Sequence, residues 1–455
     1  MNQKKISLLG CLGLGIGGIV GAGIFGTLPE VTAQIGPGII YALLGAVVVI
    51  VFRSVTRMYT IAALPSNASA FMHASKLMHP IVGALSTINA FLQCTMVSLF
   101  GVLFSMYFGD LFPGVELSST VSSVGILIIF MCISWFGNKT SVRIGNIMVV
   151  VLLSAMVLYI VLGFPNLDAE NITFVEIVKP GVGISTIAAS AGVLTSSLSG
   201  AAFCAELADE METPERNVPL SIILCPVIVA VLYALMAVVT LGVIPYAEVS
   251  TLAQVAGCFM APALLKFFVV AGPICGIITS LVPMALACVA SMDFSARNKI
   301  LPEIFGKKNK HDIAWFSLII TYVISIVICA SGATFGVIMT IFSFTNTVVE
   351  MPNAVAPIFA LKKYPKTCEN SFVKFSPGVV KILSVITLLI LIYLAVEMAR
   401  TLDAAAVIGI LAVYVIGYVY VLLRRNYLKK TENLDLFEVM SAPYAPWEEK
   451  EASYK

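Results

Sequence analysis

Charged side chains are scarce in this sequence, and the scarcity decides its class. Asp, Glu, Lys and Arg make up 11% of the 455 residues, whereas 59% of the residues are hydrophobic. A soluble domain carries about 25% charged residues. The composition therefore excludes a soluble globular protein and indicates an integral membrane protein whose partner is the lipid bilayer. The net charge of +2 gives no reason to expect a nucleic acid as partner.

Motifs for metal or catalytic chemistry are also missing. The ten cysteines lie almost all in apolar stretches without a CxxC pair, and His73, His79 and His311 are too scattered for a metal cluster. Cysteines of this kind usually behave as small hydrophobic residues. No Ser/His/Asp arrangement or phosphate-binding loop occurs. We therefore predict neither an enzyme nor a protein that holds a metal or cofactor.

Long apolar runs dominate what is present. Most exceed about 18 residues, the length that an α-helix needs to cross hydrocarbon, and the alternation of an outer-membrane barrel is absent. Lys4 and Lys5 precede the first run without a cleavage site, so this run is interpreted as a span and not as a signal peptide. The sequence predicts an all-α integral membrane protein with twelve transmembrane helices, at residues 6–34, 38–62, 82–109, 120–137, 142–164, 184–208, 218–243, 261–291, 313–331, 334–361, 378–398 and 403–424.

The distribution of Lys and Arg orients these helices. If both termini lie inside, the outer loops contain only Lys179, Lys266 and Arg400, and the remaining 24 of the 27 basic residues lie on the inner side or at inner helix ends. The positive-inside rule expects this asymmetry. We predict a multi-pass protein of the cell (plasma) membrane with both termini cytoplasmic. Residues 1–430 would form the transmembrane domain, and residues 431–455 a cytoplasmic tail that is partly ordered by Phe437, Tyr444 and Trp447.

Two apolar segments contain too many small residues for unbroken membrane helices. Residues 17–26 (GGIVGAGIFG) include five glycines, and each costs about 1 kcal/mol in a helix relative to alanine. Residues 195–205 (TSSLSGAAFCA) form a similar run in the sixth helix. Bare backbone cannot face lipid, so we predict two helices that break at a polar cavity near the membrane midplane. The alternative is two separate packing faces of small residues.

The spacing of the two breaks predicts internal symmetry. They lie five helices apart, and an odd number of spans reverses orientation, so residues 6–164 and 184–361 would be inverted repeats. Residues 378–424 add two further helices. Paired interrupted helices in two halves point to a transporter binding site. A dinucleotide-type match, G-x-G-x-x-G at residues 13–18, is rejected because it lies inside a span and does not follow a strand.

Several segments resemble one transporter family. Residues 18–25 (GIVGAGIF) resemble the helix-1 signature of the amino acid–polyamine–organocation (APC) superfamily of secondary transporters, and residues 208–219 (ADEMETPERNVP) resemble the run that follows its sixth helix. Residues 298–302 (NKILP), and residues 63–65 (ALP) with Phe71, match less specific family stretches. The resemblance covers about residues 6–430. It implies an amino acid permease with a five-plus-five inverted-repeat fold, broken helices 1 and 6, and two extra helices.

The resemblance also implies a main-chain binding site. In helix 1, exposed N–H groups would face a carboxylate at the positive end of the following half-helix. The carbonyl that ends the preceding half-helix, together with carbonyls in helix 6, would accept from an ammonium group. A carboxylate site beside an ammonium site recognises an α-amino acid. The residues concerned are Ala22 and Gly23 for the carboxylate, Gly21 for the bend, and Ile19, Ser196, Ser199 and Gly200 for the ammonium.

The sequence departs from the family at three positions. Ser196 and Ala202 stand where the family often has an aromatic residue and a glutamate. Leu152 stands where proton-coupled members can carry a lysine in helix 5, so the amine that replaces a sodium ion in such folds is missing. Because Ser196 and Ala202 are small, the pocket either lacks the usual aromatic lid and is roomier, or another residue covers it, namely Phe203, Met284 or Phe344.

Polar residues inside spans are further candidates, because they are costly in lipid. Asn89 and Gln93 share one face of the third helix, with Gln93 where the family lines its substrate site; the alternative is an interhelical hydrogen bond. Thr279 and Ser280 would line a cation site near helix 1; the alternative is a hydrogen bond to their own i−4 carbonyls. Met284 would line the pocket or simply pack in the core.

Helix 10 holds Asn346, Thr347 and Glu350 well inside a span. Glu350 has no basic partner nearby in the sequence, and a buried carboxylate without a cation is a candidate for taking up a proton. We expect Glu350, with Asn346 beside it, to take part in proton coupling or to bind a cationic group of the substrate. The alternative is an ion pair with a basic residue near the inner face. Glu397 is expected to pair locally with Arg400.

Together these features predict a secondary active transporter that moves amino acids by alternating access, as an exchanger or with protons. Its partners would be a small-molecule substrate (an amino acid or amine), the bilayer and protons. One alternative is a carrier of polyamines or other organic cations, with Glu350 as the recognition residue. An alternative of another class is a transporter-like membrane sensor, which the absence of an appended signalling domain disfavours. The side-chain class of the substrate is left open.

Overall fold

The computed structural model describes residues 7–21, 23–66, 69–112, 114–115, 117–137, 142–168, 171, 179–202 and 211–454, with backbone alone at residues 14, 142–146 and 201–202. Within these residues the chain is helical apart from loops and isolated bridge residues, such as the pair Lys308 and Ala314. The predicted all-helical membrane protein is thus confirmed in its class. Eight helical stretches of the described residues are long and apolar enough to cross a membrane, and four shorter apolar helices accompany them.

The apolar helices follow the predicted spans closely. The first predicted span consists of two helices, and the third and eighth are also divided. The elements are α1 (Leu8–Ile19), α2 (Gly23–Ile35), α3 (Ile39–Ala63), α5 (Pro80–Leu92), α6 (Cys94–Leu111), α7 (Ser119–Trp135), α8 (Val142–Gly163), α9 (Ile184–Ser197), α11 (Pro214–Val243), α13 (Pro262–Val269), α14 (Cys275–Arg297), α15 (Trp315–Ala330), α16 (Phe335–Lys363), α18 (Pro377–Thr401) and α19 (Ala404–Thr431).

Two predicted helices are less regular than expected. The stretch predicted as one helix over 82–109 is interrupted at Gln93, where the Thr95 hydroxyl donates to the Leu92 carbonyl at 2.7 Å and competes with the backbone ladder. The stretch predicted over 261–291 contains a π-helical turn, Val270–Ile274, around Pro273. Proline has no N–H to donate, so the ladder must loosen there.

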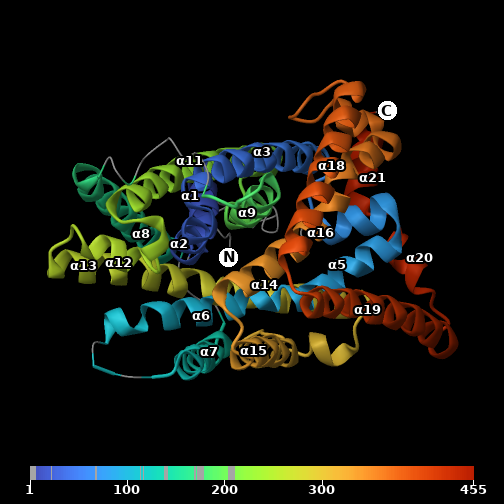
Figure 1. Cartoon of the computed structure of the whole chain (residues 1–455). Helices are drawn as coiled ribbons and strands as arrows, with labels where there is room; N and C mark the ends of the chain where they lie inside the picture. Colours follow the sequence, from blue (N-terminus) through green and yellow to red (C-terminus); the bar gives the residue numbers. More distant parts are fainter. Residues whose placement is uncertain are drawn as a thin grey trace.

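The helices form two layers. One layer contains α1, α3, α9 and α11, and the other contains α5, α6, α7, α14 and α15; the helices within each layer pack on one another. Figure 1 shows the first layer above the second, with α16 and α18 crossing between them. We call these the α3 layer and the α6 layer. Their contacts bury a continuous apolar core that includes Phe25, Tyr107 and Phe268.

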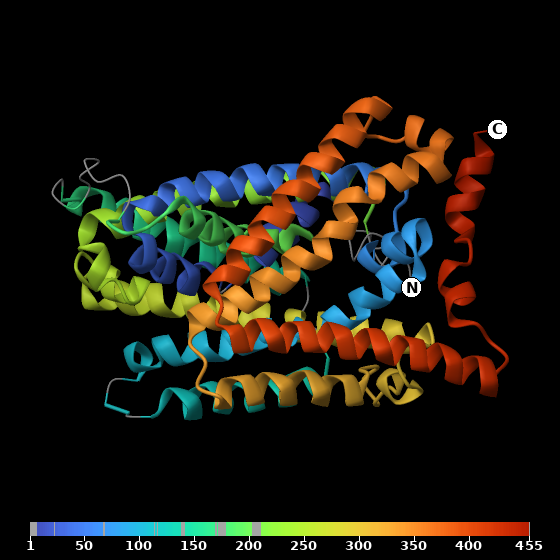
Figure 2. The same cartoon turned by 45° about the vertical axis from the view of Figure 1, so that its right-hand side comes forward.

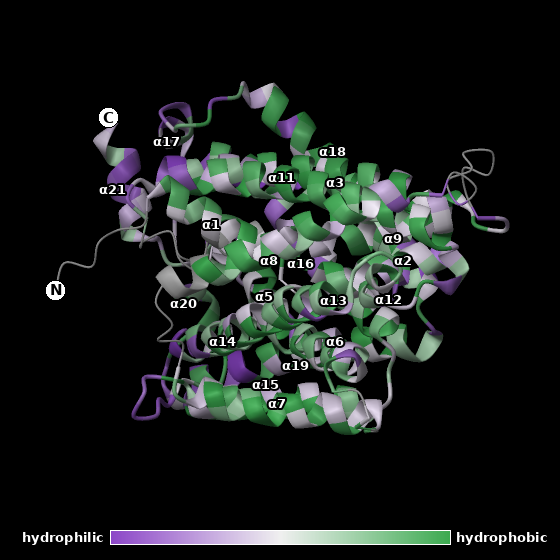
Figure 3. Ribbon diagram, turned by 90° about the vertical axis from the view of Figure 1, so that its left-hand side faces the viewer, coloured by the Kyte–Doolittle hydropathy of each residue, from purple (hydrophilic) through white to green (hydrophobic). Residues whose placement is uncertain are grey.

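The outer surface fits a bilayer. Figure 3 shows apolar residues along the lengths of the helices and hydrophilic residues gathered toward their two ends. On α19, Ile408, Val415 and Ile416 are each more than 60% exposed. Such a continuous exposed apolar face is not tolerated in water and is matched by lipid.

Short helices cover the end of the molecule where α3 ends and α11 begins, and we call it the α21 end. They are α4 (Ser69–His73), α17 (Pro365–Glu369), α20 (Leu436–Ser441) and α21 (Ala445–Ser453). Trp447 on α21 is 1% exposed, and Tyr444 packs edge-on against it at 5.3 Å. The Phe437 ring lies 4.2 Å from the Arg425 guanidinium. The predicted ordering of the tail by these aromatic residues is confirmed.

The buried His73 makes stability depend on pH. Burial lowers the pKa of His73 to about 4 from its usual 6.5, and the nearby Arg57 charge acts in the same direction. Below pH 6.5 the folded protein therefore binds fewer protons on this ring than the unfolded chain does, so the free energy of unfolding falls as the pH drops. We expect a loss of about 3 kcal/mol from this residue by pH 4, measured by thermal unfolding in detergent.

Two variants isolate the effect. His73→Gln keeps a donor for the Leu64 carbonyl, which the His73 ring contacts at 2.9 Å, and should lose stability less steeply with acid. His311→Gln, at the remote half-buried histidine of another loop, should follow the wild type. Parallel stability curves for the wild type and His73→Gln would contradict this account.

Candidate functional site

The first predicted break lies where the glycines are. Helix α1 ends at Ile19, the Val20 N–H donates to the Ile16 carbonyl at 2.7 Å, and α2 begins at Gly23. Glycine makes an interruption cheap because it adopts many backbone conformations. The predicted interruption of the first helix is confirmed. Ala22, the predicted carboxylate-facing residue, lies outside the described residues.

The second break follows α9. The helix ends at Ser197, and a 3-10 turn, η4 (Ser199–Ala202), continues the chain. The helix predicted to run to residue 208 is therefore not continuous, as expected for a broken span. Phe203, a candidate lid, lies outside the described residues.

The two breaks lie against each other. A Cβ atom placed on Gly200 would lie 2.1 Å from the Gly18 carbonyl oxygen and 2.5 Å from the Ile19 nitrogen, so the two backbones touch and only glycine fits. Nearby, the Ser197 hydroxyl donates to Thr27 Oγ1 on α2 at 3.2 Å. The two breaks, which are far apart in the sequence, are thus in direct backbone contact.

One predicted acceptor already has a protein donor. The Tyr233 hydroxyl on α11 donates to the Ile19 carbonyl at 3.1 Å, and Tyr233 is fully buried. A carbonyl oxygen has two lone pairs, so one stays available for an ammonium group. Sequence reasoning missed Tyr233, because a tyrosine in an apolar helix looks like an ordinary core residue.

Several buried polar atoms of α14 and α16 lack partners within the described residues. The Ser280 hydroxyl on α14 is buried and has no hydrogen-bond partner there, and neither have Ser343 Oγ and Asn346 Nδ2 on α16. Ser280 faces the first break, because a Cβ on Gly21 would lie 2.0 Å from its oxygen. Buried polar atoms are usually satisfied by protein, water or ligand, so the Ser280 hydroxyl stays a candidate contact for a ligand at the first break.

Other candidates are held by their own helices. The Thr279 hydroxyl donates to the carbonyls of Cys275 and Gly276 at 2.9 and 3.0 Å, which is the alternative considered from sequence. Ser196 Oγ donates to the Gly192 carbonyl at 3.3 Å, and Ser199 Oγ to the Thr195 carbonyl at 2.7 Å.

The remaining candidates are Met284, Phe344 and Gln93. Met284 is buried in the apolar core, and the half-buried Phe344 packs against this core. Gln93 lies at the junction of α5 and α6. The polar contacts beside it lead to other helices: Tyr414 on α19 donates to Asn89 at 3.1 Å, and Ser325 on α15 donates to the Cys94 carbonyl at 3.0 Å.

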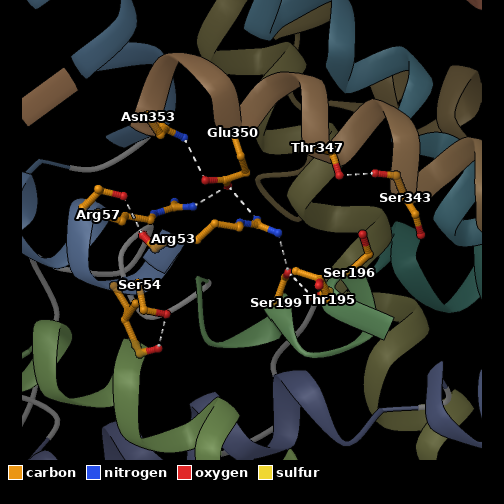
Figure 4. Close-up of polar contacts among 12 residues, drawn as sticks. Arg53, Ser54, Arg57, Thr195, Ser196, Ser199, Ser343, Thr347, Glu350 and Asn353 are labelled. Carbon is orange, nitrogen blue, oxygen red and sulfur yellow. Dashed lines mark hydrogen bonds and ion pairs between the residues drawn. The ribbon is translucent and has the colours of Figure 1, made fainter. Parts of the chain in front are cut away.

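For Glu350 the structure bears out the alternative considered from sequence, an ion pair with a basic residue, because this carboxylate has two cations beside it. Glu350 Oε1 lies 2.8 Å from Arg57 Nη1 and 3.4 Å from Arg53 Nη2, and Asn353 Nδ2 donates to Oε2 at 3.4 Å. Figure 4 shows the carboxylate of α16 pointing toward both guanidinium groups of α3. All three charged side chains are buried. Arg53 and Arg57 are four residues apart and share a helical face, which is the sequence signal that was missed.

The charged cluster reaches the second break. Arg53 Nη1 donates to Ser199 Oγ at 3.2 Å, as Figure 4 shows. A cavity of about 20 Å³ lies here, with room for little more than one water molecule. Its walls are Ile50, Arg53, Ser54, Arg57, Leu198, Ser199, Ile222, Pro226 and Glu350. The cluster therefore joins α3, α16 and the broken sixth span around one polar space.

Comparison with known families decides the class of protein. The profile of the amino acid permease family matches residues 6–422. The chain belongs to this family. It is accordingly a multi-pass membrane transporter with an amino acid-type substrate, and not an enzyme.

Similar proteins transport different small molecules. The methylthioribose transporter of Bacillus subtilis (strain 168) is 22% identical over 392 residues, which are 80% of this chain and 83% of that protein. The branched-chain amino acid permease BcaP of the same organism is 22% identical over 334 residues, 67% of this chain and 70% of that protein. Its aspartate-proton symporter is 23% identical over 254 residues, 53% of this chain and 48% of that protein.

The contact between the breaks gives a first prediction for the site. Gly200→Ala places a methyl group into the Gly18 carbonyl, and overpacking of this kind costs about 1–3 kcal/mol. We expect a lower unfolding temperature of the purified protein. Gly183→Ala, at the N-cap of the same helix, has open space around its Cβ and should lower the stability less, since it loses only the N-cap preference for glycine over alanine. Equal stability of the two variants would show that the breaks do not touch.

The charged cluster gives a second prediction. Glu350→Gln removes the carboxylate that faces two buried arginines, and removing one partner of a buried ion pair costs about 3–5 kcal/mol. Glu369→Gln, at an exposed glutamate of α17, is the matched control and should change stability little. Thermal unfolding of both variants measures the difference, and a Glu350→Gln protein as stable as the control would rule out the ion pairs.

Proposed function

We propose that this permease is a secondary active transporter that moves amino acids across the cell membrane by alternating access. The contact of Gly200 with Gly18 and Ile19 carries the proposal, because it brings two interrupted helices together at the centre of the molecule. Discontinuous helices that meet in this way form substrate sites in inverted-repeat transporters.

We further propose twelve spans in a five-plus-five inverted repeat with two added helices. In this assignment α1 with α2 is the first span, and α9 with the chain after it is the sixth. Residues 6–164 and 184–361 are the repeats, and α18 and α19 are the added helices. The first span of each repeat is interrupted at a run of small residues, and this correspondence supports the symmetry. Both termini lie on the cytoplasmic side, in keeping with the distribution of Lys and Arg.

The substrate is held by its main-chain groups. The N–H groups of Ala22 and Gly23 bind the carboxylate at the start of α2, where the helix dipole favours an anion. The Ile19 carbonyl and carbonyls near Ser196 and Ser199 accept from the ammonium group. Tyr233 supports this arrangement because its hydroxyl fixes the direction of the Ile19 carbonyl.

The charged cluster weighs against the alternative of a polyamine carrier. Glu350 was the residue expected to recognise a cationic group, but it lies 2.8 and 3.4 Å from two guanidinium groups. A cationic substrate group approaching it would be repelled by those charges. We assign Glu350 to closure of the site instead: its pairs with Arg53 and Arg57 close one side of the site, and the Arg53 contact with Ser199 links that closure to the broken sixth span.

A thermal-shift comparison tests the recognition of the main-chain groups. We expect free α-amino acids to stabilise the purified protein, by about 2.7 kcal/mol when the ligand is at 100 times its Kd. Amino acid amides lack the carboxylate and N-acetyl amino acids lack the ammonium, so neither series should stabilise it. Proteoliposomes should then accumulate the stabilising amino acid from a radiolabelled set.

The outcome that overturns the proposal is equally specific. Stabilisation by diamines alone, with none by amino acids, would establish an amine carrier. Equal stabilisation by amino acids and their amides would show that the start of α2 does not bind the carboxylate.

A further inference from the structure

The C-terminal segment crosses the α21 end of the molecule from one layer to the other. Helix α19 packs on α5 in the α6 layer, and α20 packs on α5 and on Ala74–Met78. Helix α21 then reaches Pro65, which follows α3, and Glu215 at the start of α11. Figure 2 shows this segment rising from α19 along one side of the molecule to the C-terminus.

Trp447 anchors the segment. Its indole N–H donates to the Pro65 carbonyl at 3.0 Å, and its ring packs against His73 at 5.6 Å and edge-on against Tyr364 at 6.0 Å. The side chain is 1% exposed. A buried aromatic residue in a pocket of this kind carries much of the energy of an interface.

Polar contacts hold α21 on either side of Trp447. Glu451 accepts from the backbone N–H groups of Lys366 and Thr367 at 3.1 and 2.7 Å, which caps α17. The Tyr364 hydroxyl donates to Glu448 at 2.8 Å, and Lys450 lies 2.6 Å from Glu215. These contacts tie α21 to the chain that follows α16 as well as to α11.

Helix α4, which carries His73, also contacts the charged cluster. Arg57 Nη2 donates to the Ser69 hydroxyl at 3.4 Å, and Ser69 is the first residue of α4, whose last residue is His73. Helix α4 therefore has the Arg57 contact at one end and the Trp447 contact at the other. A displacement of α21 would therefore disturb α4, and through α4 the Arg57 contact at the side of the site that the cluster closes.

We propose that residues 436–453 are a regulatory strap that holds the two layers together at the α21 end and thereby restrains transport. The inference rests on the proposed alternating-access mechanism, because that mechanism moves one group of helices against the other. A segment attached to both groups must stretch or detach when they separate. Its attachment sets how often the α21 end opens.

The test uses the full-length protein in nanodiscs and needs no substrate. Ile222→Cys places a thiol in the wall of the cavity beside Arg53, and its modification by a water-soluble maleimide is followed by mass spectrometry of the peptide carrying residue 222. Hydrogen exchange of α21 reports separately whether the strap is attached. In this background Trp447→Ala and Glu451→Gln should each speed exchange of α21. They should also speed labelling, by about tenfold for Trp447→Ala, as expected when a buried aromatic anchor is truncated.

Glu449→Gln is the matched control, because Glu449 is exposed on the same helix and has no hydrogen bond or ion pair in the described part of the chain. It should leave both rates at the wild-type value. Faster exchange of α21 without faster labelling would overturn the proposal, since the segment would then be an attachment without control of the site. Unchanged exchange of α21 in Trp447→Ala would overturn it as well.

A transport measurement separates this proposal from the proposed function. Proteoliposomes reconstituted with the strap variants and given a radiolabelled amino acid mixture should show initial uptake rates several-fold above those of the wild type. If no variant moves any amino acid but labelling at residue 222 still rises on release, the substrate assignment fails and the strap stands. If transport occurs at one rate in all variants, the strap fails and the transporter stands.

Discussion

The centre of this protein is constrained by the need to satisfy backbone hydrogen-bonding groups inside a membrane. Hydrocarbon supplies no hydrogen-bond partner, so a helix can be interrupted there only where protein or a polar cavity covers the loose N–H and C=O groups. The break after Ile19 meets this requirement through Tyr233, which covers the carbonyl, and through Gly200, which brings a second interrupted segment onto the first. The α3 layer follows from this requirement, because α9 and α11 must pack close to α1 to provide the cover.

The buried charges serve a different purpose. A buried ion pair adds little net stability, because desolvation of the charges offsets most of their attraction. Its geometry is nevertheless demanding, since α3 and α16 cannot slide apart without separating Glu350 from Arg53 and Arg57. Contacts of this kind favour two discrete arrangements over a continuum. The Arg53 hydrogen bond to Ser199 extends this geometric constraint to the broken sixth span.

Local patterns were enough to predict the helices and both breaks, because hydrophobic runs and glycines act on the backbone where they stand. The interruptions at Gln93 and at Val270–Ile274 escaped prediction. The first depends on a threonine side chain that competes with the helix, and the second on a proline whose effect is a π turn and not an end.

The partners at the site were less accessible to prediction. Glu350 and Arg57 are 293 residues apart, and no periodicity links residues that meet only after folding. In the sequence, Arg53 and Arg57 counted only as basic residues that indicate membrane orientation, so their pairing with Glu350 was not predicted. Tyr233 was hidden for a similar reason, since its apolar neighbours describe a span but not the carbonyl that its hydroxyl meets.

The attachment of α21 has a practical consequence for anyone who handles the protein. Trp447 lies within nine residues of the last position of the sequence and is seated against the Pro65 carbonyl. A purification tag or fluorescent protein placed directly after α21 would lie close to that anchor, and its bulk and motion would strain the contacts of Trp447. Labels placed beside α21 would therefore disturb its contacts, whereas the exposed turn that contains Gly332, remote in sequence from α21, offers a more neutral place for a small epitope.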